Sequence, residues 1–273
     1  MRNHEKKEAI EISSSSKKKK ATNQSVPLCC KIFFSEAHSR APLDTIERAA
    51  RLDPETVITR FTLVSYVIHD STGFAIYSPL QQTFLAMFEV AYETINLEQH
   101  SGTHPRLGVV DDIVLHPLAR ASLDEAAWLT KAVTTDIGNR FQVPVFLYGA
   151  AHPTGKALDS IRWELGYYRP NFMDNQWAGW TMPEILSVKP DEGPTCVSRA
   201  RGITMIGARP WVRLYNVTMI STDVSVARRI ARMVSARGGG LTTVQSLGLV
   251  HGENSIKIAC MLLEPNRVEG DRV

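Results

Sequence analysis

Residues 109–148, VVDDIVLHPLARASLDEAAWLTKAVTTDIGNRFQVPVFLY, contain the pattern that decides the fold class. The run Val109–Leu115 is rich in β-branched and aliphatic residues and predicts a strand. Ser122 follows, with Glu125 three residues later, and this spacing is typical of a helix capping box. After the expected helix, the nearly unbroken apolar run Val143–Tyr148 predicts a second, buried strand. Strand, helix and strand in this order predict an α/β protein.

The same alternation continues on both sides of this stretch. Toward the N-terminus the sequence predicts a helix at Leu43–Leu52, a strand at Arg60–Ile68 and a helix opening at Ser78 and Pro79. Toward the C-terminus it predicts a strand at Trp211–Ile220, a helix at Asp223–Ala236 that stops at Gly238–Gly240, and strands at Thr243–Val250 and Ile256–Leu263. Between the two series, Pro170–Pro194 has little periodicity and predicts a boundary near residue 190.

The excess positive charge lies at one end of the chain. The chain has 273 residues, 44% of them hydrophobic, and a net charge of +3. Residues 1–26 carry seven Lys or Arg and three Glu, which leaves 24 basic and 25 acidic residues elsewhere. A nearly neutral folded part argues against nucleic acid as the main partner, because a nucleic-acid binder concentrates basic charge on its folded domain.

Residues 1–26 are predicted to form a disordered basic tail. They contain Ser13–Ser16 and Lys17–Lys20 and no aromatic residue, so they cannot bury enough apolar surface to offset their conformational entropy. The lysine run leaves a nuclear address open as an alternative to a solvated tail.

The remaining composition predicts a cytoplasmic protein with no membrane segment and no metal. The spacing of its four cysteines fits no zinc site, and they are Cys29, Cys30, Cys196 and Cys260. No apolar run approaches the ~20 residues that span a bilayer, and the start of the chain lacks the apolar stretch of a secretory signal. A homodimer is left open.

The first candidate site is the polar loop His100–Gly108. His100 and His104 are four residues apart, but an intervening glycine and a following proline argue against the helix that would let them share a metal. An imidazole exchanges protons near neutral pH, which suits His104 to acid–base catalysis. The alternative is that His104 stabilises a turn and that Arg106 pairs with a nearby aspartate.

The second candidate site is a loop in which two glycines enclose two arginines. It consists of Gly193, Pro194, Thr195, Cys196, Val197, Ser198, Arg199, Ala200, Arg201 and Gly202. Because the planar guanidinium matches a carboxylate, this loop suits an anionic ligand. An ordinary solvated linker is the alternative.

These loops resemble the formiminotransferase domain known from formimidoyltransferase-cyclodeaminase, and most of all its plant formiminotransferase-like branch. The family motif His-Pro-Arg-hydrophobic-Gly, followed by a strand containing Asp, is matched by His104–Gly108 and then Asp111 and Asp112. Further matching segments are Phe34–Glu36, Val143–Gly149 and Gly207–Arg209. The resemblance extends from about Leu28 to the C-terminus.

The resemblance implies an α/β (α+β) fold with two subdomains, 27–190 and a shortened 191–273. Each is expected to be a mixed β-sheet with helices on its outer face, and the two sheets are expected to face each other. The implied activity is a one-carbon transfer of histidine metabolism, from formiminoglutamate to the co-substrate tetrahydrofolate. His104 corresponds to the family's catalytic histidine, Arg106 to a ligand-binding residue and Gly193–Gly202 to the folate-binding loop.

Three departures from the family pattern keep a second interpretation open. The acidic segment that precedes the strand at Phe61–Ser65 in the family is shorter here, with Val57 and Ile58 at the corresponding positions. Arg199 and Arg201 stand where the family has mostly small and aromatic residues. The sequence also ends at Val273, before the family's last helix and strand and without a cyclodeaminase segment. The second interpretation is a catalytically impaired folate-binding or regulatory protein that retains the fold.

Overall fold

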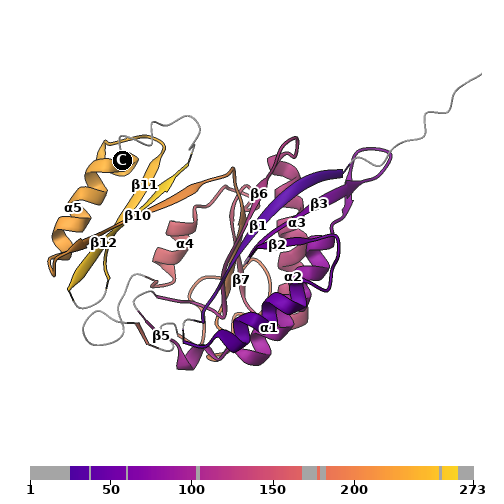
Figure 1. Ribbon diagram of the computed structural model, residues 1–273, viewed down its shortest axis with the longest axis horizontal. Helices are drawn as coiled ribbons and strands as arrows, with labels where there is room; N and C mark the ends of the chain where they lie inside the picture. Colours follow the sequence, from indigo (N-terminus) through magenta and orange to yellow (C-terminus); the bar gives the residue numbers. More distant parts are fainter. Residues whose placement is uncertain are drawn as a thin grey trace, which may run out of the picture.

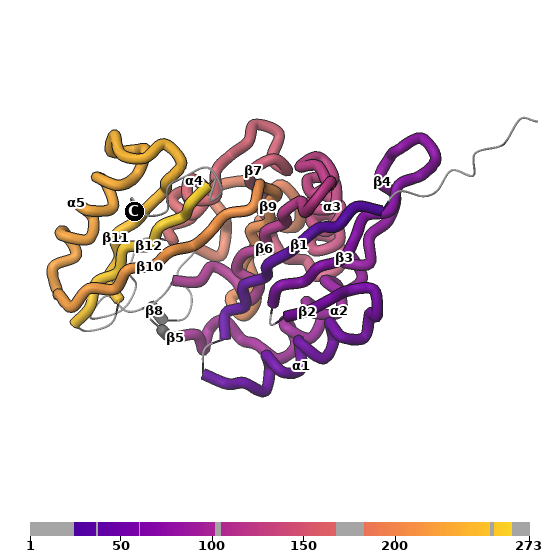
Figure 2. The backbone as a smooth tube through the Cα atoms, turned by 45° about the horizontal axis from the view of Figure 1, so that its top comes forward, coloured from indigo at the N-terminus to yellow at the C-terminus, as the bar shows by residue number. Residues whose placement is uncertain are grey.

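The computed structural model describes residues 25–36, 38–59, 61–102, 105–167, 177–178, 183–251 and 254–263. These residues form two main β-sheets with helices packed on them (Figures 1 and 2). The predicted α/β class is therefore confirmed. The predicted tail lies outside the described residues except for Ser25 and Val26, which pair with Ile68 and Val67 and so belong to a strand instead.

The first sheet has seven strands in the order β2-β3-β1-β6-β9-β7, with β4 also paired to β3. Its strands are β1 (Ser25–Phe34), β2 (Val57–Thr59), β3 (Thr62–His69), β4 (Ala75–Tyr77), β6 (Val110–Pro117), β7 (Val145–Gly149) and β9 (Thr204–Ala208). Neighbours β6, β9 and β7 run parallel, whereas the other pairs are antiparallel. The sheet is mixed, as expected.

Strand β9 lies between β6 and β7 although it follows the boundary that the sequence predicts near residue 190. Its five residues are all buried, and so short a run carries little periodicity of its own. The chain leaves the first sheet after Ala208 and enters the second at Arg213. Residues Arg209–Val212 therefore join the two sheets, and we call this segment the connector.

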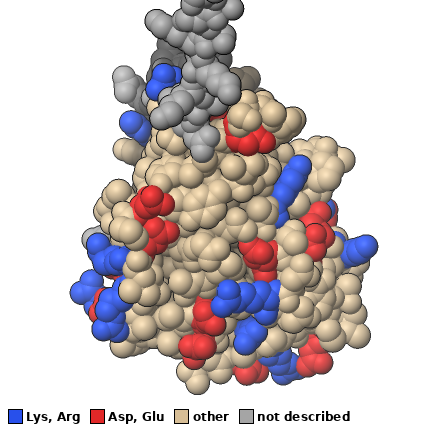
Figure 3. Space-filling view, turned by 90° about the vertical axis from the view of Figure 1, so that its right-hand side faces the viewer, with Lys and Arg blue, Asp and Glu red and all other residues tan. Residues whose placement is uncertain are grey.

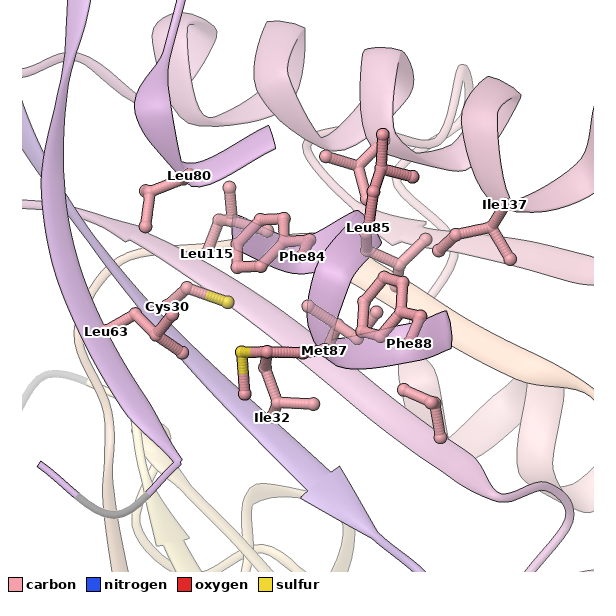
Figure 4. Close-up of a cluster of buried hydrophobic side chains, with 14 of the residues drawn as sticks. Cys30, Ile32, Leu63, Leu80, Phe84, Leu85, Met87, Phe88, Leu115 and Ile137 are labelled. Atoms are coloured by element: carbon pink, nitrogen blue, oxygen red, sulfur yellow. The ribbon is translucent and has the colours of Figure 1, made fainter. Parts of the chain in front are cut away.

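Three helices cover the outer face of the first sheet: α1 (Arg40–Ala50), α2 (Pro79–Thr94) and α3 (Leu123–Asp136). The predicted capping box of α3 is present, since Ser122 Oγ accepts from the backbone N–H of Glu125 and the Glu125 carboxylate accepts from that of Ser122. Between helices and sheet lies the main hydrophobic core, where Phe84, Phe88 and their neighbours are fully buried (Figure 4). Burial of each such side chain stabilises the fold by about 1.5–3 kcal/mol.

The opposite face of the first sheet, which we call the inner face, carries a smaller cluster and a helix that was not predicted from the sequence. This helix, α4 (Leu158–Glu164), packs its Leu158 and Ile161 on strand residues such as Phe146 and Met205. In Figure 1 α4 lies between the two sheets. The remaining short elements near this sheet are η1 (Leu97–Gln99), β5 (Ser101–Gly102), η2 (Ile137–Phe141) and β8 (Trp177–Ala178).

The second sheet contains β10 (Arg213–Ile220), β12 (Ser255–Leu262) and β11 (Val244–Val250), in that spatial order. All its pairs are antiparallel, not mixed as expected, because β12 inserts between the two strands that helix α5 (Val224–Val234) connects. Ala227 and Ala231 of α5 pack on Ile256 and Ile258. A 3-10 turn, η4 (Ala236–Gly238), ends the helical segment at the predicted glycine run.

Helix α5 covers the side of the second sheet that faces away from the first, as Figures 1 and 2 show. The helices thus lie outside both sheets, with α4 as the exception. Within the described ranges, every helix is too short or too polar to cross a lipid bilayer. On the face seen in Figure 3, acidic and basic side chains are interspersed.

Candidate functional site

A cleft of about 160 Å³ lies where the inner face of the first sheet meets the second sheet. Met261 of β12 and Leu214 of β10 line it from the second sheet. Its polar lining comes from the first sheet, α4, the connector and the loop before β6, and consists of Lys31, Arg106, Asp111, Asp112, His116, Arg162 and Arg209. We call the space that these residues enclose the inter-sheet cleft.

Two consecutive aspartates reach the same cleft because β6 is irregular. Phe33 pairs with Asp112 but Phe34 pairs with Val110, so Asp111 is an extra residue on β6. Such a bulge breaks the strict alternation by which neighbouring side chains point to opposite faces. Asp111 Oδ1 accepts a 2.7 Å hydrogen bond from the Leu107 backbone N–H, which fixes the loop before the strand.

Arginines from two elements meet these carboxylates. Arg162 of α4 places Nη2 3.5 Å from Asp111 Oδ2 and 3.7 Å from Asp112 Oδ2. Its guanidinium also lies 4.6 Å from the ring centroid of Tyr167. Arg106 Nη1 is 4.0 Å from Asp111 Oδ2, at the limit of an ion pair. The His-Pro-Arg loop therefore does bring its arginine to an aspartate, and this pair lines the inter-sheet cleft.

Asp112 is held on its other side by a buried tyrosine. The Tyr148 hydroxyl donates to Asp112 Oδ1 over 2.9 Å. Burial raises the pKa of Asp112, and the Arg162 and Arg209 guanidinium groups act in the opposite direction. Gly207 faces the Tyr148 ring, and a Cβ at this position would lie 2.3 Å from two of the ring carbons. The glycine is thus what allows this aromatic ring to lie across β9.

His116 of β6 is fully buried and turned toward the connector. Its Nδ1 is 3.1 Å from the carbonyl oxygens of both Arg209 and Pro210. Since a carbonyl can only accept, Nδ1 carries the proton and Nε2 has the free lone pair. Among the described residues Nε2 has no hydrogen-bond partner. Burial lowers the pKa of His116 to about 4, so the imidazole is neutral at physiological pH.

Aromatic and cationic groups surround this histidine. The ring centroids of His116 and Trp211 are 5.1 Å apart, and Lys31 Nζ lies 3.9 Å from the centroid of the Trp211 ring. Burial lowers the pKa of Lys31, Cys29 acts in the opposite direction, and the nearby Arg209 lowers it further. Arg209 Nη1 reaches Met261 Sδ in the second sheet at 2.9 Å. Four basic side chains against two aspartates leave the cleft positively charged, which suits a ligand with carboxylates.

The structure separates the other predicted site residues. His104 lies outside the described residues, two positions before Arg106. In the predicted folate-binding loop, Val197 packs in the inner-face cluster, but Arg199 is exposed and its Nη2 is 2.9 Å from Glu184 Oε1. Arg201 donates from Nη1 to the Phe141 carbonyl at 2.9 Å and lines a second cavity beside α2. Neither arginine is among the residues that line the inter-sheet cleft in the described part of the chain.

The rest of this loop is held by its backbone. Gly193 and Gly202 have φ of +83° and +72°, which only glycine adopts readily. Ser198 O accepts from the backbone N–H groups of Arg201 and Gly202, and Ala200 O accepts from that of Leu97. The backbones of Cys196 and Ile185 pair in an isolated antiparallel β-bridge, and the Leu186 N–H donates to Thr195 O. Pro194 is half-buried. The loop is thus a well-fixed border of the first sheet.

Several cleft residues were not predicted from the sequence, namely Lys31, His116, Arg162 and Arg209. The signal for two of them was present, because Lys31 interrupts an apolar strand and His116 shares a strand face with Asp112 and Val114. Within the described ranges no group of three or more His, Cys, Asp or Glu is arranged to hold a metal ion.

Fold and site together define a two-sheet α/β protein with a positively charged cleft between its sheets. The model of the formiminotransferase domain, N-terminal subdomain, matches residues 27–209. This chain therefore belongs to the formiminotransferase family.

Curated relatives agree with this family. A formiminotransferase cyclodeaminase-like protein of Arabidopsis thaliana is 44% identical over 251 residues, which are 90% of this chain and 84% of the relative. A glutamate formimidoyltransferase of Thermoplasma acidophilum is 32% identical over 65% of this chain and 56% of its own length. The formimidoyltransferase-cyclodeaminase of Rattus norvegicus is 28% identical over 86% of this chain, which spans only 43% of that longer protein.

Proposed function

We propose that this protein is a formimidoyltransferase that moves a formimino group from formiminoglutamate to tetrahydrofolate in the inter-sheet cleft. The observation that carries the proposal is the position of Arg106. The family motif, His-Pro-Arg, brings this arginine to the edge of a positively charged cleft between the two sheets. Both ligands carry carboxylates, and a guanidinium binds a carboxylate through paired hydrogen bonds.

The proposed reaction is an acyl-type transfer between two amines. The N5 amine of tetrahydrofolate attacks the formimino carbon and forms the new C–N bond, while His104 accepts the amine proton. The tetrahedral intermediate then collapses: the bond between its carbon and the glutamate nitrogen breaks, and His104 returns the proton to that nitrogen. The buried charges of Asp111 and Asp112 hold Arg106 and Arg162 in place around the ligand.

The Gly193–Gly202 loop remains part of the proposed site through Val197. Val197 packs against the cluster that includes Leu107 and Tyr167, and Tyr167 also lines the cleft. The loop would thus shape one wall of the folate site. Its Arg199 and Arg201 side chains are engaged elsewhere, so the carboxylate contacts are assigned to Arg106 and Arg209.

A folate-binding protein without turnover is the second candidate, and one observation favours it. Where the family carries polar residues, this chain has the short strand β2, in which Val57 is 67% exposed and Ile58 is buried in the helix-side core. Neither side chain offers a hydrogen bond to a substrate.

A formimino-transfer assay with tetrahydrofolate and formiminoglutamate distinguishes the two candidates. Transfer by the parent protein, lost about 10²- to 10⁴-fold in His104→Ala with folinate affinity retained, supports the enzyme. Folinate binding without transfer supports the second candidate. A folded protein that neither binds nor transfers contradicts both.

A further inference from the structure

We propose that His116 is a ligand-binding residue of the inter-sheet cleft, whose Nε2 accepts a hydrogen bond from the N–H of an N-substituted dicarboxylic amino acid. This role rests on the proposed function and belongs to a residue outside the two sequence loops. It identifies the group that would distinguish the nitrogen-bearing end of the donor from a plain dicarboxylate.

The hydrogen bonds of His116 are incomplete. A buried polar group without a partner costs roughly 1–3 kcal/mol, so nearly all such groups in folded proteins are satisfied. His116 is fully buried, and its Nε2 has no partner among the described residues. A ligand N–H in the cleft that His116 lines would supply the missing donor.

The connector decides what kind of group Nε2 can meet. The bonds from Nδ1 to the Arg209 and Pro210 carbonyls hold the proton on Nδ1, so that Nε2 can only accept. Burial favours the neutral ring, and the charged groups near it, Lys31 and Arg209, favour it too. Nε2 is therefore an acceptor throughout the neutral pH range, and its natural partner is an N–H or O–H group.

The charge around this acceptor narrows the class of ligand. Lys31 lies beside the same Trp211 ring that contacts His116, and Arg209 follows one residue after β9. These cations attract carboxylates. A molecule with carboxylates and an N–H group can contact both the cations, Lys31 and Arg209, and the acceptor, His116 Nε2. A plain dicarboxylate can contact only the cations.

Two substitutions distinguish the role of Nδ1, which bonds the connector, from the role of Nε2, which is the proposed ligand acceptor. In His116→Asn the amide nitrogen lies near the position of Nδ1, so the bonds to the connector are retained and the acceptor is lost. In His116→Gln the amide oxygen lies near the position of Nε2, so an acceptor is retained and the connector bonds are lost. Thermal unfolding shows that each variant is folded before its ligand binding is compared.

The probes are N-formylglutamate and glutarate, two dianions that differ by the formylamino group that carries the N–H, together with formiminoglutamate. Calorimetric titration is expected to show about tenfold weaker binding of both nitrogen-bearing probes to His116→Asn, and a change of less than about twofold for glutarate. His116→Gln is expected to remain within about threefold of the parent for all three probes.

Three results overturn the inference. Equal losses of about tenfold or more for glutarate and for the nitrogen-bearing probes, in either variant, mean that His116 supports the shape of the cleft and does not select the N–H group. Unchanged affinity in His116→Asn means that Nε2 does not contact the ligand. In both cases the parent still binds and transfers, so the proposed function stands. If the folded parent binds none of the probes and transfers nothing, the proposed function and this inference fail together.

Discussion

The Tyr148 hydroxyl donates a 2.9 Å hydrogen bond to Asp112, and both groups are buried on the inner face of the first sheet. This contact joins β7 to β6 across β9, which lies between them. It also gives a carboxylate that has little contact with water one of the few donors it can use. The same hydrogen bond therefore connects two strands of the sheet and stabilises a carboxylate that lines the cleft.

Replacing Tyr148 with Phe is expected to lower the free energy of unfolding by about 1–3 kcal/mol, because a buried carboxylate loses a donor. Chemical denaturation measures this change. Tyr92→Phe is the matched control, since the hydroxyl of this buried tyrosine is hydrogen-bonded to the neutral hydroxyl of Thr204 at 3.1 Å. A smaller loss is expected there, of about 0.5–1.5 kcal/mol. Equal losses would show that the charge on Asp112 adds nothing.

Gly207→Ala is expected to destabilise the protein by roughly 1–3 kcal/mol, because the added methyl group meets the Tyr148 ring at 2.3 Å. Urea denaturation of the variant checks this value. In a Tyr148→Leu background the same substitution should cost less, because the ring is gone. A cost that is independent of the residue at position 148 would contradict the steric explanation.

The free energy of unfolding is expected to decrease as the pH falls, over a pH range set by the pKa of His116. Its pKa is about 4 in the folded protein against an ordinary value of 6.5, so the unfolded chain binds the proton first as the pH falls. The stabilisation is fully present above pH ~6.5 and decreases toward pH ~4, by at most about 3 kcal/mol. Unfolding free energies of the parent and His116→Asn, measured between pH 8 and 4, should converge on acidification. Parallel curves would exclude the effect.

Folinate affinity is expected to depend on cleft arginines and not on the exposed loop arginine. Arg209→Met and Arg106→Met should each weaken calorimetric binding about tenfold, a loss of about 1.4 kcal/mol typical of a charged hydrogen bond. Arg199→Met should have little effect, because Arg199 pairs with Glu184 on the surface, where an ion pair contributes little. The reverse pattern would move the carboxylate site to the Gly193–Gly202 loop.

Local sequence signals were sufficient for much of the fold. The Ser122–Glu125 capping box and the apolar run before Gly149 identify α3 and β7, because capping and burial act over a few residues. Strand β9 was not predicted, because its neighbours in the sheet, β6 and β7, are distant from it in the sequence. The same reason explains the site, where Arg162 and Asp111 meet only after the chain has folded. The bulge at Asp111 depends on the pairing with β1 and has no signature in β6 alone.

The connector gives the two sheets a mechanical relationship. In the described part of the chain the sheets are joined covalently by Arg209–Val212, and two carbonyls of this segment are bonded to one imidazole of the first sheet. A second link lies at the surface, where Arg237 Nη2 is 2.6 Å from Asp159 Oδ2 of α4. Moving the sheets apart would stretch the hydrogen bonds between His116 and the connector. The exposed Arg237–Asp159 ion pair could separate more easily, because water can solvate both charges. The two sheets should therefore hinge at the connector, and a ligand should enter the cleft from the side of the Arg237–Asp159 ion pair.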